Sequence, residues 1–217
     1  MMPKRAERGG GSGHSTGSPL QGRAGVHEAP RRKQKQGRRA ASAVNKATPP
    51  NDTVTYAIVD SPIGRLLVAA TERGISWVGV GDSDDELIKG LRLRHQRGNI
   101  IRAGRAIPFA EAVKRLLDGY ETPLPLDIRG TDFQLDVWRT IQRIPQGETR
   151  SYSEVARLVG RPSAVRAVAN ACASNPVPFV IPCHRVIRKD GEPGGYGFGI
   201  QRKKWLIEHE QKLVHRN

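Results

Sequence analysis

Three short apolar runs follow one another between residues 53 and 81, and turn-forming residues separate each run from the next. The runs read TVTYAIVD, GRLLVAAT and GISWVGVG, and they are divided by the pair Ser61-Pro62 and by the tripeptide ERG. β-Branched and aromatic residues favour strands, and connections this short join antiparallel neighbours. The pattern therefore predicts a three-stranded antiparallel meander.

Two helices are predicted to follow this sheet. The stretch DSDDELIKGLRLRHQ begins with acidic residues, which the positive end of a helix dipole favours, and PFAEAVKRLLDGYE carries apolar residues on one helical face. The next stretch, PLPLDIRG, is predicted to form an edge strand. Residues 53–130 are therefore expected to form an N-terminal α/β subdomain, and the fold class is mixed α/β (α+β).

The second half of the chain, residues 131–217, is predicted to be mainly helical. Capping-box spacing in TDFQ and SYSE marks two helix starts, at Thr131 and Ser151. Gly160 occupies the place of a C-terminal cap, and AVRAVANACASN forms the next helix after the turn RPS. Two short helices joined by a turn that contains glycine are a candidate helix-turn-helix.

Positive charge is concentrated at the N-terminus but is not confined to it. The formal net charge is +15; residues 1–50 hold 11 Lys or Arg and two Glu, which gives +9 and leaves +6 for the rest. This segment is rich in Gly, Ser and Pro and lacks apolar periodicity, so residues 1–52 are expected to be a disordered basic tail. The tail is either a solvated segment without a specific role, a phosphate-binding arm or a localisation signal. The overall charge favours nucleic acid as a partner.

Two cysteines, Cys172 and Cys183, are too few for a disulfide framework or a four-cysteine zinc site. This cysteine usage fits a reducing intracellular compartment. No apolar run approaches the roughly 20 residues that span a bilayer, and the N-terminus lacks the apolar core of a signal peptide. We therefore expect a soluble cytoplasmic protein that does not bind a membrane.

The second helix of the candidate helix-turn-helix is rich in alanine and carries Arg166 in its first turn. Small side chains let a helix backbone approach a partner closely, and the arginine supplies a charge or a wedge at the point of approach. The alternative is a tightly packed core helix that has one surface arginine. The composition of the helix leaves both interpretations open.

The stretch VIPCHRVI places Cys183 directly before His184, between two short apolar runs. A thiol beside polar groups can be stabilised as the thiolate, which is the nucleophilic form. The alternative is a small apolar residue in a buried strand, because free cysteine is among the most buried residue types. Cys172, which lies among alanines, is interpreted as structural. The glycine-rich loop RKDGEPGGYGFG and the helix IQRKKWLIEHEQKL follow.

Taken together, RAVANACASNPVPFVIPCHRVI, GGYGFG and RKKWLIEHE resemble the O6-alkylguanine-DNA alkyltransferase family, the methylated-DNA:protein-cysteine methyltransferases. The resemblance covers roughly residues 54–211 and extends in particular to the alkyltransferase half of bacterial Ada proteins. It implies an RNase H-like N-terminal domain, followed by a winged-helix-like catalytic domain with a helix-turn-helix. The implied activity is single-turnover transfer of an alkyl group from O6-alkylguanine, and from O4-alkylthymine, in double-stranded DNA.

The resemblance also assigns roles to residues. Cys183 would be the alkyl acceptor, His184 its base through a water molecule, Glu210 the group that orients His184, and Asn175 the support of the preceding turn. Arg166 would fill the gap left by the flipped nucleotide, and Tyr152 would press on the adjacent phosphate. Further DNA-contacting residues would be Ser151, Ala164, Ala167 and Ala171. The substrate pocket would comprise Tyr196, Gly197, Pro182 and Val186.

The transfer would need no cofactor. Some relatives hold a structural zinc, but residues 53–130 contain no cysteine and a single histidine, His95, so no metal is expected. We expect a monomer, with cooperative binding along DNA left open, located at the nucleoid, or in the nucleus of a eukaryote. A lesion-binding protein without transfer activity is the main alternative function. A cysteine hydrolase is a weaker one.

Overall fold

The computed structural model describes residues 53–96, 99–102, 104–120 and 122–215. These residues belong to one compact unit. The predicted basic tail, residues 1–52, lies outside the described residues. None of the described helices is long and apolar enough to cross a membrane.

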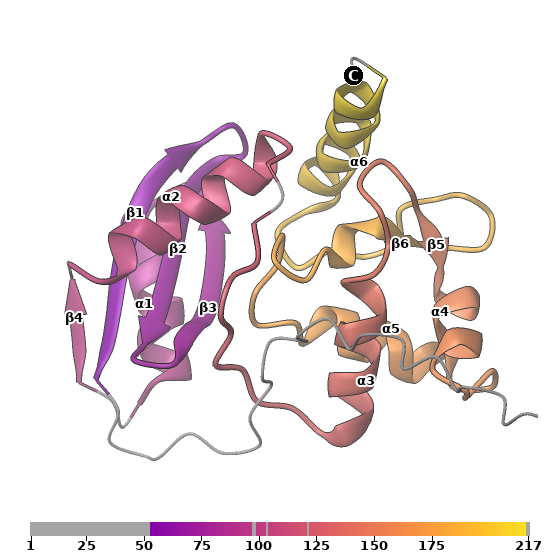
Figure 1. Cartoon of the computed structure of the whole chain (residues 1–217), viewed down its shortest axis with the longest axis horizontal. Coiled ribbons are helices and arrows are strands. Elements are labelled where there is room, and N and C mark those ends of the chain that lie inside the picture. The colour runs from indigo at the N-terminus through magenta and orange to yellow at the C-terminus, as the bar shows by residue number, and fades with distance from the viewer. Residues whose placement is uncertain (1–52, 97–98, 103, 121, 216–217) are drawn as a thin grey trace, which may run out of the picture. The chain divides into compact units, whose positions relative to one another are not determined.

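The predicted meander is confirmed, and a fourth strand extends it (Figure 1). Strands β1 (Val54–Ser61), β2 (Gly64–Thr71) and β3 (Gly74–Gly81) pair antiparallel in sequence order. Strand β4 (Ile100–Arg102) pairs parallel to β1 at the other edge, so the expectation of three strands was incomplete. A three-residue strand has too little pattern of its own, since its pairing depends on a partner more than 40 residues away.

Helices α1 (Asp84–Arg94) and α2 (Ala106–Leu117) cover opposite faces of this sheet (Figure 1). Successive residues of a strand point to opposite faces, so neighbouring apolar residues enter different cores. The smaller core lies under α1 and includes Tyr56, Leu67 and Trp77. The larger core lies under α2 and continues into the second half of the chain.

The predicted edge strand PLPLDIRG forms a single bridge and not a strand, so this prediction was wrong. The Ile75 N–H donates to the Pro125 carbonyl oxygen at 2.9 Å, and the Asp127 N–H donates to the Ile75 carbonyl oxygen at 2.9 Å. Pro123 and Pro125 lack the N–H groups that a longer ladder would need. The segment still covers part of the outer edge of β3.

Four helices make up most of the second half: α3 (Asp132–Ile141), α4 (Tyr152–Leu158), α5 (Val165–Ala173) and α6 (Ile200–Val214). Both predicted capping boxes are present, at the starts of α3 and α4. Gly160 adopts a positive φ of 74° just beyond α4. The N–H groups of Gly160 and Arg161 donate to the carbonyls of Arg157 and Ala156, which is a Schellman ending. Helices α4 and α5 thus form the expected helix-turn-helix.

The segment that contains the Cys-His pair contacts α3 and α6. Residues Cys183–Arg185 form one turn of 3₁₀ helix, η1, and strand β6 (Val186–Ile187) then pairs parallel with β5 (Arg150–Ser151). The Val78 N–H of β3 donates to the Pro176 carbonyl oxygen at 2.8 Å. The edge of the sheet therefore directly supports the chain that leads to Cys183.

Candidate active site

Cys183 is the first residue of η1, and it is 6% exposed. Pro182 precedes it, and the Cys183 N–H donates to the Ile181 carbonyl oxygen at 2.7 Å. The thiol is thus largely buried, but it sits on a tight helical turn instead of the strand that its apolar neighbours suggested. Short apolar runs do not distinguish a strand from other buried backbone.

Asn175 joins the end of α5 to the residues that precede the cysteine. Its side-chain N–H donates to the Ile181 carbonyl oxygen at 2.8 Å, and its side-chain oxygen accepts from the Val177 N–H at 3.0 Å. Both groups of the carboxamide are therefore used to shape the turn. This network fixes the backbone two residues before Cys183.

Glu210 of α6 holds both residues that follow the cysteine. Its Oε1 lies 2.8 Å from Nε2 of the buried His184, and Arg185 donates to Oε2 and Oε1 at 2.8 and 2.9 Å. The Gly147 N–H also donates to Oε2, at 3.2 Å. The carboxylate thus accepts from three residues, and the arginine balances its charge. The sequence prediction paired Glu210 with His184 and missed Arg185.

The protonation states of this pair follow from its surroundings. Burial alone would raise the pKa of Glu210, but the hydrogen bonds and charges of His184 and Arg185 outweigh burial and lower it to about 2. Burial lowers the pKa of His184, and Glu210 only partly opposes this effect. A neutral imidazole beside a carboxylate carries its proton on Nε2, so Nδ1 keeps a free lone pair. Among the described residues, this buried Nδ1 has no hydrogen-bond partner.

Lys203 of α6 is a second residue that the sequence prediction missed. It is 1% exposed, and its Nζ donates to the Val186 carbonyl oxygen at 2.6 Å. Burial lowers the pKa of Lys203, while Cys183 and Cys172 favour its charged form. The available signal was helical spacing, because Lys203, Leu206 and Glu210 form the buried face of α6.

The thiol of Cys183 is mainly neutral in this environment. Burial raises its pKa, and the Asn175 side chain and the Lys203 charge act in the opposite direction. A base is therefore needed to generate the thiolate during a reaction. The lone pair of His184 is a suitable proton acceptor, since the low pKa of the imidazole keeps that residue neutral.

Two tyrosine rings lie close to the Lys203 ammonium group. The Lys203 Nζ lies 5.8 Å from the ring centre of Tyr152 and 6.0 Å from that of Tyr196. Burial raises the pKa of Tyr152 to about 12 and that of Tyr196 well above its ordinary value. The Tyr196 hydroxyl is buried without a hydrogen-bond partner among the described residues. It is therefore free to donate to a ligand.

Tyr196 belongs to residues 195–199, which we call the pocket loop. The Gly199 N–H donates to the Tyr196 carbonyl oxygen at 3.0 Å, and the rings of Tyr196 and Phe198 meet edge to face at 5.6 Å. Gly197 is exposed, and a Cβ atom built on it would have no neighbour within 4 Å. Pro182 and Val186, the other predicted pocket residues, are buried on either side of η1.

The predicted DNA-contacting residues divide between two faces of α5 and the start of α4. Arg166 and Ala167 are exposed, together with Asn170, and Ala164 lies half-buried at the N-cap of α5. Ala171 is 1% exposed, so its side chain packs in the core and cannot contact DNA as predicted. Tyr152 is half-buried at the first position of α4, and the Ser151 hydroxyl is used in the capping box there.

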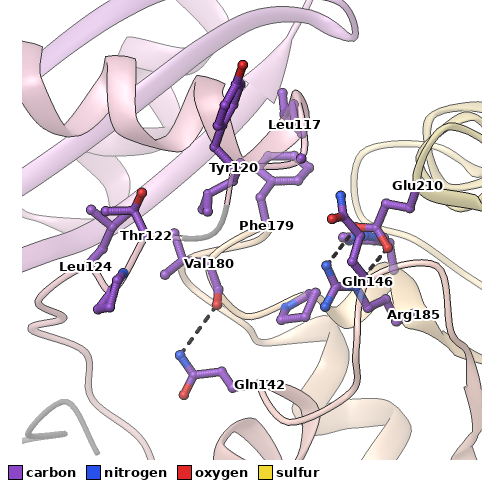
Figure 2. A pocket seen from close by; sticks show the side chains of 15 residues that line it. Leu117, Tyr120, Thr122, Leu124, Gln142, Gln146, Phe179, Val180, Arg185 and Glu210 are labelled. Atoms are coloured by element: carbon purple, nitrogen blue, oxygen red, sulfur yellow. Dashed lines mark hydrogen bonds and ion pairs between the residues drawn. The ribbon is translucent and has the colours of Figure 1, made fainter. Parts of the chain in front are cut away.

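A cavity of about 470 Å³ borders the Arg185–Glu210 ion pair (Figure 2). Tyr120 and Phe179 line another side of it, and Gln142 and Gln146 contribute carboxamides. Pro182 and His184, which flank Cys183 in the chain, also line this cavity, whereas Cys183, Lys203 and Tyr196 do not. In the described part of the chain, no group of three or more His, Cys, Asp or Glu side chains is arranged to hold a metal ion.

Both halves of the chain match domains of one known protein family. Residues 54–101 match the ribonuclease-like domain of 6-O-methylguanine DNA methyltransferase, and residues 132–212 match its DNA binding domain. The chain is 45% identical over 165 residues to the bifunctional transcriptional activator/DNA repair enzyme Ada of Escherichia coli, covering 74% of this chain and 46% of Ada. The chain thus spans less than half the length of that relative.

Other relatives are matched over almost their whole length. A methylated-DNA–protein-cysteine methyltransferase of Mycolicibacterium paratuberculosis is 40% identical over 167 residues, which cover 73% of this chain and 93% of the relative. The crystal structure of Mycobacterium tuberculosis OGT in complex with DNA is similar with a TM-score of 0.62 at 35% identity, over 73% of this chain and 94% of that chain.

Proposed function

Because the chain belongs to the 6-O-methylguanine DNA methyltransferase family, we propose that it reverses O6-alkylguanine damage in duplex DNA by transferring the alkyl group to Cys183. The observation that carries this proposal is the buried thiol directly before a histidine whose Nε2 is held by Glu210 and whose Nδ1 is free. A nucleophile, a base and a group that orients the base are thereby assembled from two segments.

The transfer needs a proton acceptor and an aligned nucleophile. His184 Nδ1 takes the thiol proton through a water molecule, and Glu210 stabilises the imidazolium that forms. The sulfur of Cys183 then attacks the alkyl carbon, and the bond between that carbon and O6 breaks as the new S–C bond forms. The electron pair of the broken bond stays on the base. The product is a thioether, which is too stable to reverse, so each molecule acts once.

The departing guanine must disperse negative charge and regain a proton. Tyr196 is well placed for this task because its buried hydroxyl has no partner among the described residues. A hydrogen bond from this hydroxyl to the base would strengthen as charge develops. The proton that His184 takes from the thiol ends on the guanine, so the atoms of the reaction balance without a cofactor.

DNA delivers the damaged base to this site by base flipping, since a stacked O6-alkylguanine is out of reach of a buried thiol. The exposed face of α5 carries Arg166, Ala167 and Asn170. Because the Ala167 side chain is small, the helix backbone can approach the minor groove closely. Arg166 enters the duplex where the base has left. Tyr152 presses on the neighbouring phosphate from the first turn of α4.

Several finer properties belong to the same proposal. O4-alkylthymine is a second substrate, because it presents an alkyl–oxygen bond in a similar position. The protein acts as a monomer, with cooperative binding along DNA as the alternative. Its location follows its substrate, at the nucleoid in the cytoplasm of a bacterium or in the nucleus of a eukaryote.

Incubation with a duplex that contains O6-methylguanine, labelled in the methyl group, tests the reaction. The wild-type protein should retain the label covalently, once per molecule, and Cys183→Ala should retain none. Cys172→Ala is the matched control, because it removes the neighbouring thiol and should leave labelling intact.

Two results would replace the proposal with an alternative function. Tight binding of the lesion without covalent label would indicate a lesion-binding protein. Release of the label over many turnovers would indicate a hydrolase. Full labelling of Cys183→Ala would place the acceptor elsewhere.

A further inference from the structure

The guanidinium of Arg202, in the first turn of α6, connects three separate segments of the chain. Its Nε donates to the Ile63 carbonyl oxygen at 2.8 Å, and one terminal nitrogen donates to the Phe198 carbonyl oxygen at 3.0 Å. The other terminal nitrogen lies 2.5 Å from Oδ1 of Asp82. Ile63 lies in the turn between β1 and β2, Asp82 follows β3, and Phe198 belongs to the pocket loop.

The sheet side of this connection is rigid. In the turn between β1 and β2, the Ser61 hydroxyl donates to the Gly64 carbonyl oxygen at 2.6 Å, and Gly64 has a φ of 114°. A Cβ atom at Gly64 would lie 2.7 Å from the Gly81 carbonyl oxygen and 3.4 Å from a terminal nitrogen of Arg202. The turn, the end of β3 and the guanidinium are therefore packed without room for a methyl group.

On the pocket-loop side, the Tyr196 and Phe198 side chains pack against the core, but the glycine positions between and beside them lack such support. Cβ atoms built on Gly195, Gly197 and Gly199 would each have no neighbour within 4 Å, so side-chain packing does not fix the backbone at these positions. Glycine also permits more backbone conformations than other residues. The hydrogen bond from Arg202 to the Phe198 carbonyl oxygen thus adds a direct constraint on the backbone of the loop that carries Tyr196.

The two backbone contacts matter more than the ion pair. The side chain of Asp82 is 83% exposed, and exposed ion pairs contribute little because water screens them. The Arg202 side chain is 25% exposed. Its planar fork of N–H groups can reach several acceptors in fixed directions, which a lysine cannot do.

We propose that Arg202 is a positioning residue, through which the N-terminal sheet sets the pocket loop and hence the rate and alkyl-size selectivity of transfer to Cys183. This inference rests on the proposed alkyl transfer. It assigns a role in catalysis to a subdomain that places no reacting group beside the thiol. Loss of the connection should leave DNA binding intact but let Tyr196 and Gly197 move.

Single-turnover kinetics at saturating DNA separate these effects. Arg202→Met should lower the rate constant for an O6-methylguanine duplex by about tenfold, since small misplacements of positioning groups have effects of this size or larger. The rate ratio between O6-methyl and O6-butyl substrates should also fall, because a looser loop discriminates less by size. The Kd for undamaged duplex should stay within twofold. Arg202→Lys should give an intermediate rate, and Asp82→Asn should change little.

Arg65→Met is the matched control, because Arg65 of β2 is also an arginine held by carboxylates, those of Asp60 and Asp84. It should transfer methyl groups at the wild-type rate. A wild-type rate and size ratio in Arg202→Met would overturn the inference, and so would an equal loss in Arg65→Met or a loss explained by weaker DNA binding. If the wild-type protein acquired no methyl group, the proposed function itself would fail instead.

Discussion

The positive charge of Lys203 lies on the buried face of α6, where it favours the thiolate of Cys183. Lys203→Met removes this charge, so the pKa of Cys183 rises further and fewer molecules carry the thiolate at neutral pH. We expect the transfer rate at pH 7 to fall by about an order of magnitude. The pH profile of the rate should move to higher pH.

A purely structural role for Lys203 predicts a different outcome. The lysine also donates to the Val186 carbonyl oxygen, and loss of that bond alone would lower the rate equally at every pH. An unchanged profile would therefore contradict the electrostatic account. Lys204→Met is the control, because Lys204 is exposed at the next position and should leave both rate and profile unchanged.

Glu210 also links stability to pH. Its pKa is lowered from 4.5 to about 2 in the folded protein, so its ionised form stabilises the fold above pH 4.5, and this contribution is lost as the pH falls towards 2. A shift of this size corresponds to roughly 3 kcal/mol. Urea unfolding of the wild type should show this loss between pH 5 and 2, and Glu210→Gln should lack it. Equal pH dependence in both proteins would contradict the role of the carboxylate.

Short motifs indicated candidate residues of the site, but the pattern around Cys183 left a buried structural thiol open, and the family resemblance assigned the roles. Cys183 and His184 are adjacent in the sequence, and Asn175 begins the break after an alanine-rich helix. Arg185 and Lys203 were missed for a physical reason: charged residues are rarely buried, and only the fold shows that a carboxylate or a backbone carbonyl satisfies each of them.

The helix α5 presents one exposed face and one buried face, which gives Arg166 a testable role. Arg166→Ala should slow transfer from a duplex by about tenfold or more, because the empty space in the stack is no longer filled. Reaction with free O6-methylguanine base should not change, since the free base needs no flipping. Comparable losses with both substrates would contradict this role.

A matched control for Arg166 is available on a neighbouring helix. Arg139 of α3 is also exposed, and it pairs with Asp136 at 3.1 Å on the same helix. Arg139→Ala should therefore leave both reactions at their wild-type rates. A duplex-specific loss in this variant would mean that general surface charge, and not insertion into the duplex, explains the effect of Arg166.

Elements with local signals were predictable, and elements that depend on distant partners were not. The capping boxes of α3 and α4 and the glycine ending of α4 each lie within a few residues. Strand β4 and η1 depend on contacts far along the chain, and their sequences are short. The face of α5 was only partly predicted, because alanine fits both an exposed surface and a packed core. Ala171 belongs to the core.

At the scale of the whole molecule, the sequence concentrates charge at one end. Residues 1–50 carry a net charge of +9, and their removal should weaken binding to undamaged duplex mainly at low salt. The plot of log affinity against log salt should become less steep. Alkyl transfer at saturating DNA should persist. Identical salt series with and without residues 1–50 would reject an electrostatic role.

The interface between the two halves of the chain could not be predicted from the sequence of either half alone. One apolar core runs from the α2 face of the sheet into the helices of the second half. In addition, Val78 of β3 donates a backbone hydrogen bond to Pro176, in the segment before Cys183. Sequence patterns describe each half but not which faces meet. This interface allows the sheet to influence the pocket loop through Arg202.

Mass spectrometry of the intact protein tests the central claim most directly. After incubation with an excess of O6-methylguanine duplex, the account predicts the added mass of one methyl group per molecule, and peptide mapping should place it on Cys183. A second incubation with fresh duplex should add nothing. An unmodified protein beside repaired DNA, or a methyl group on another residue, would contradict the account.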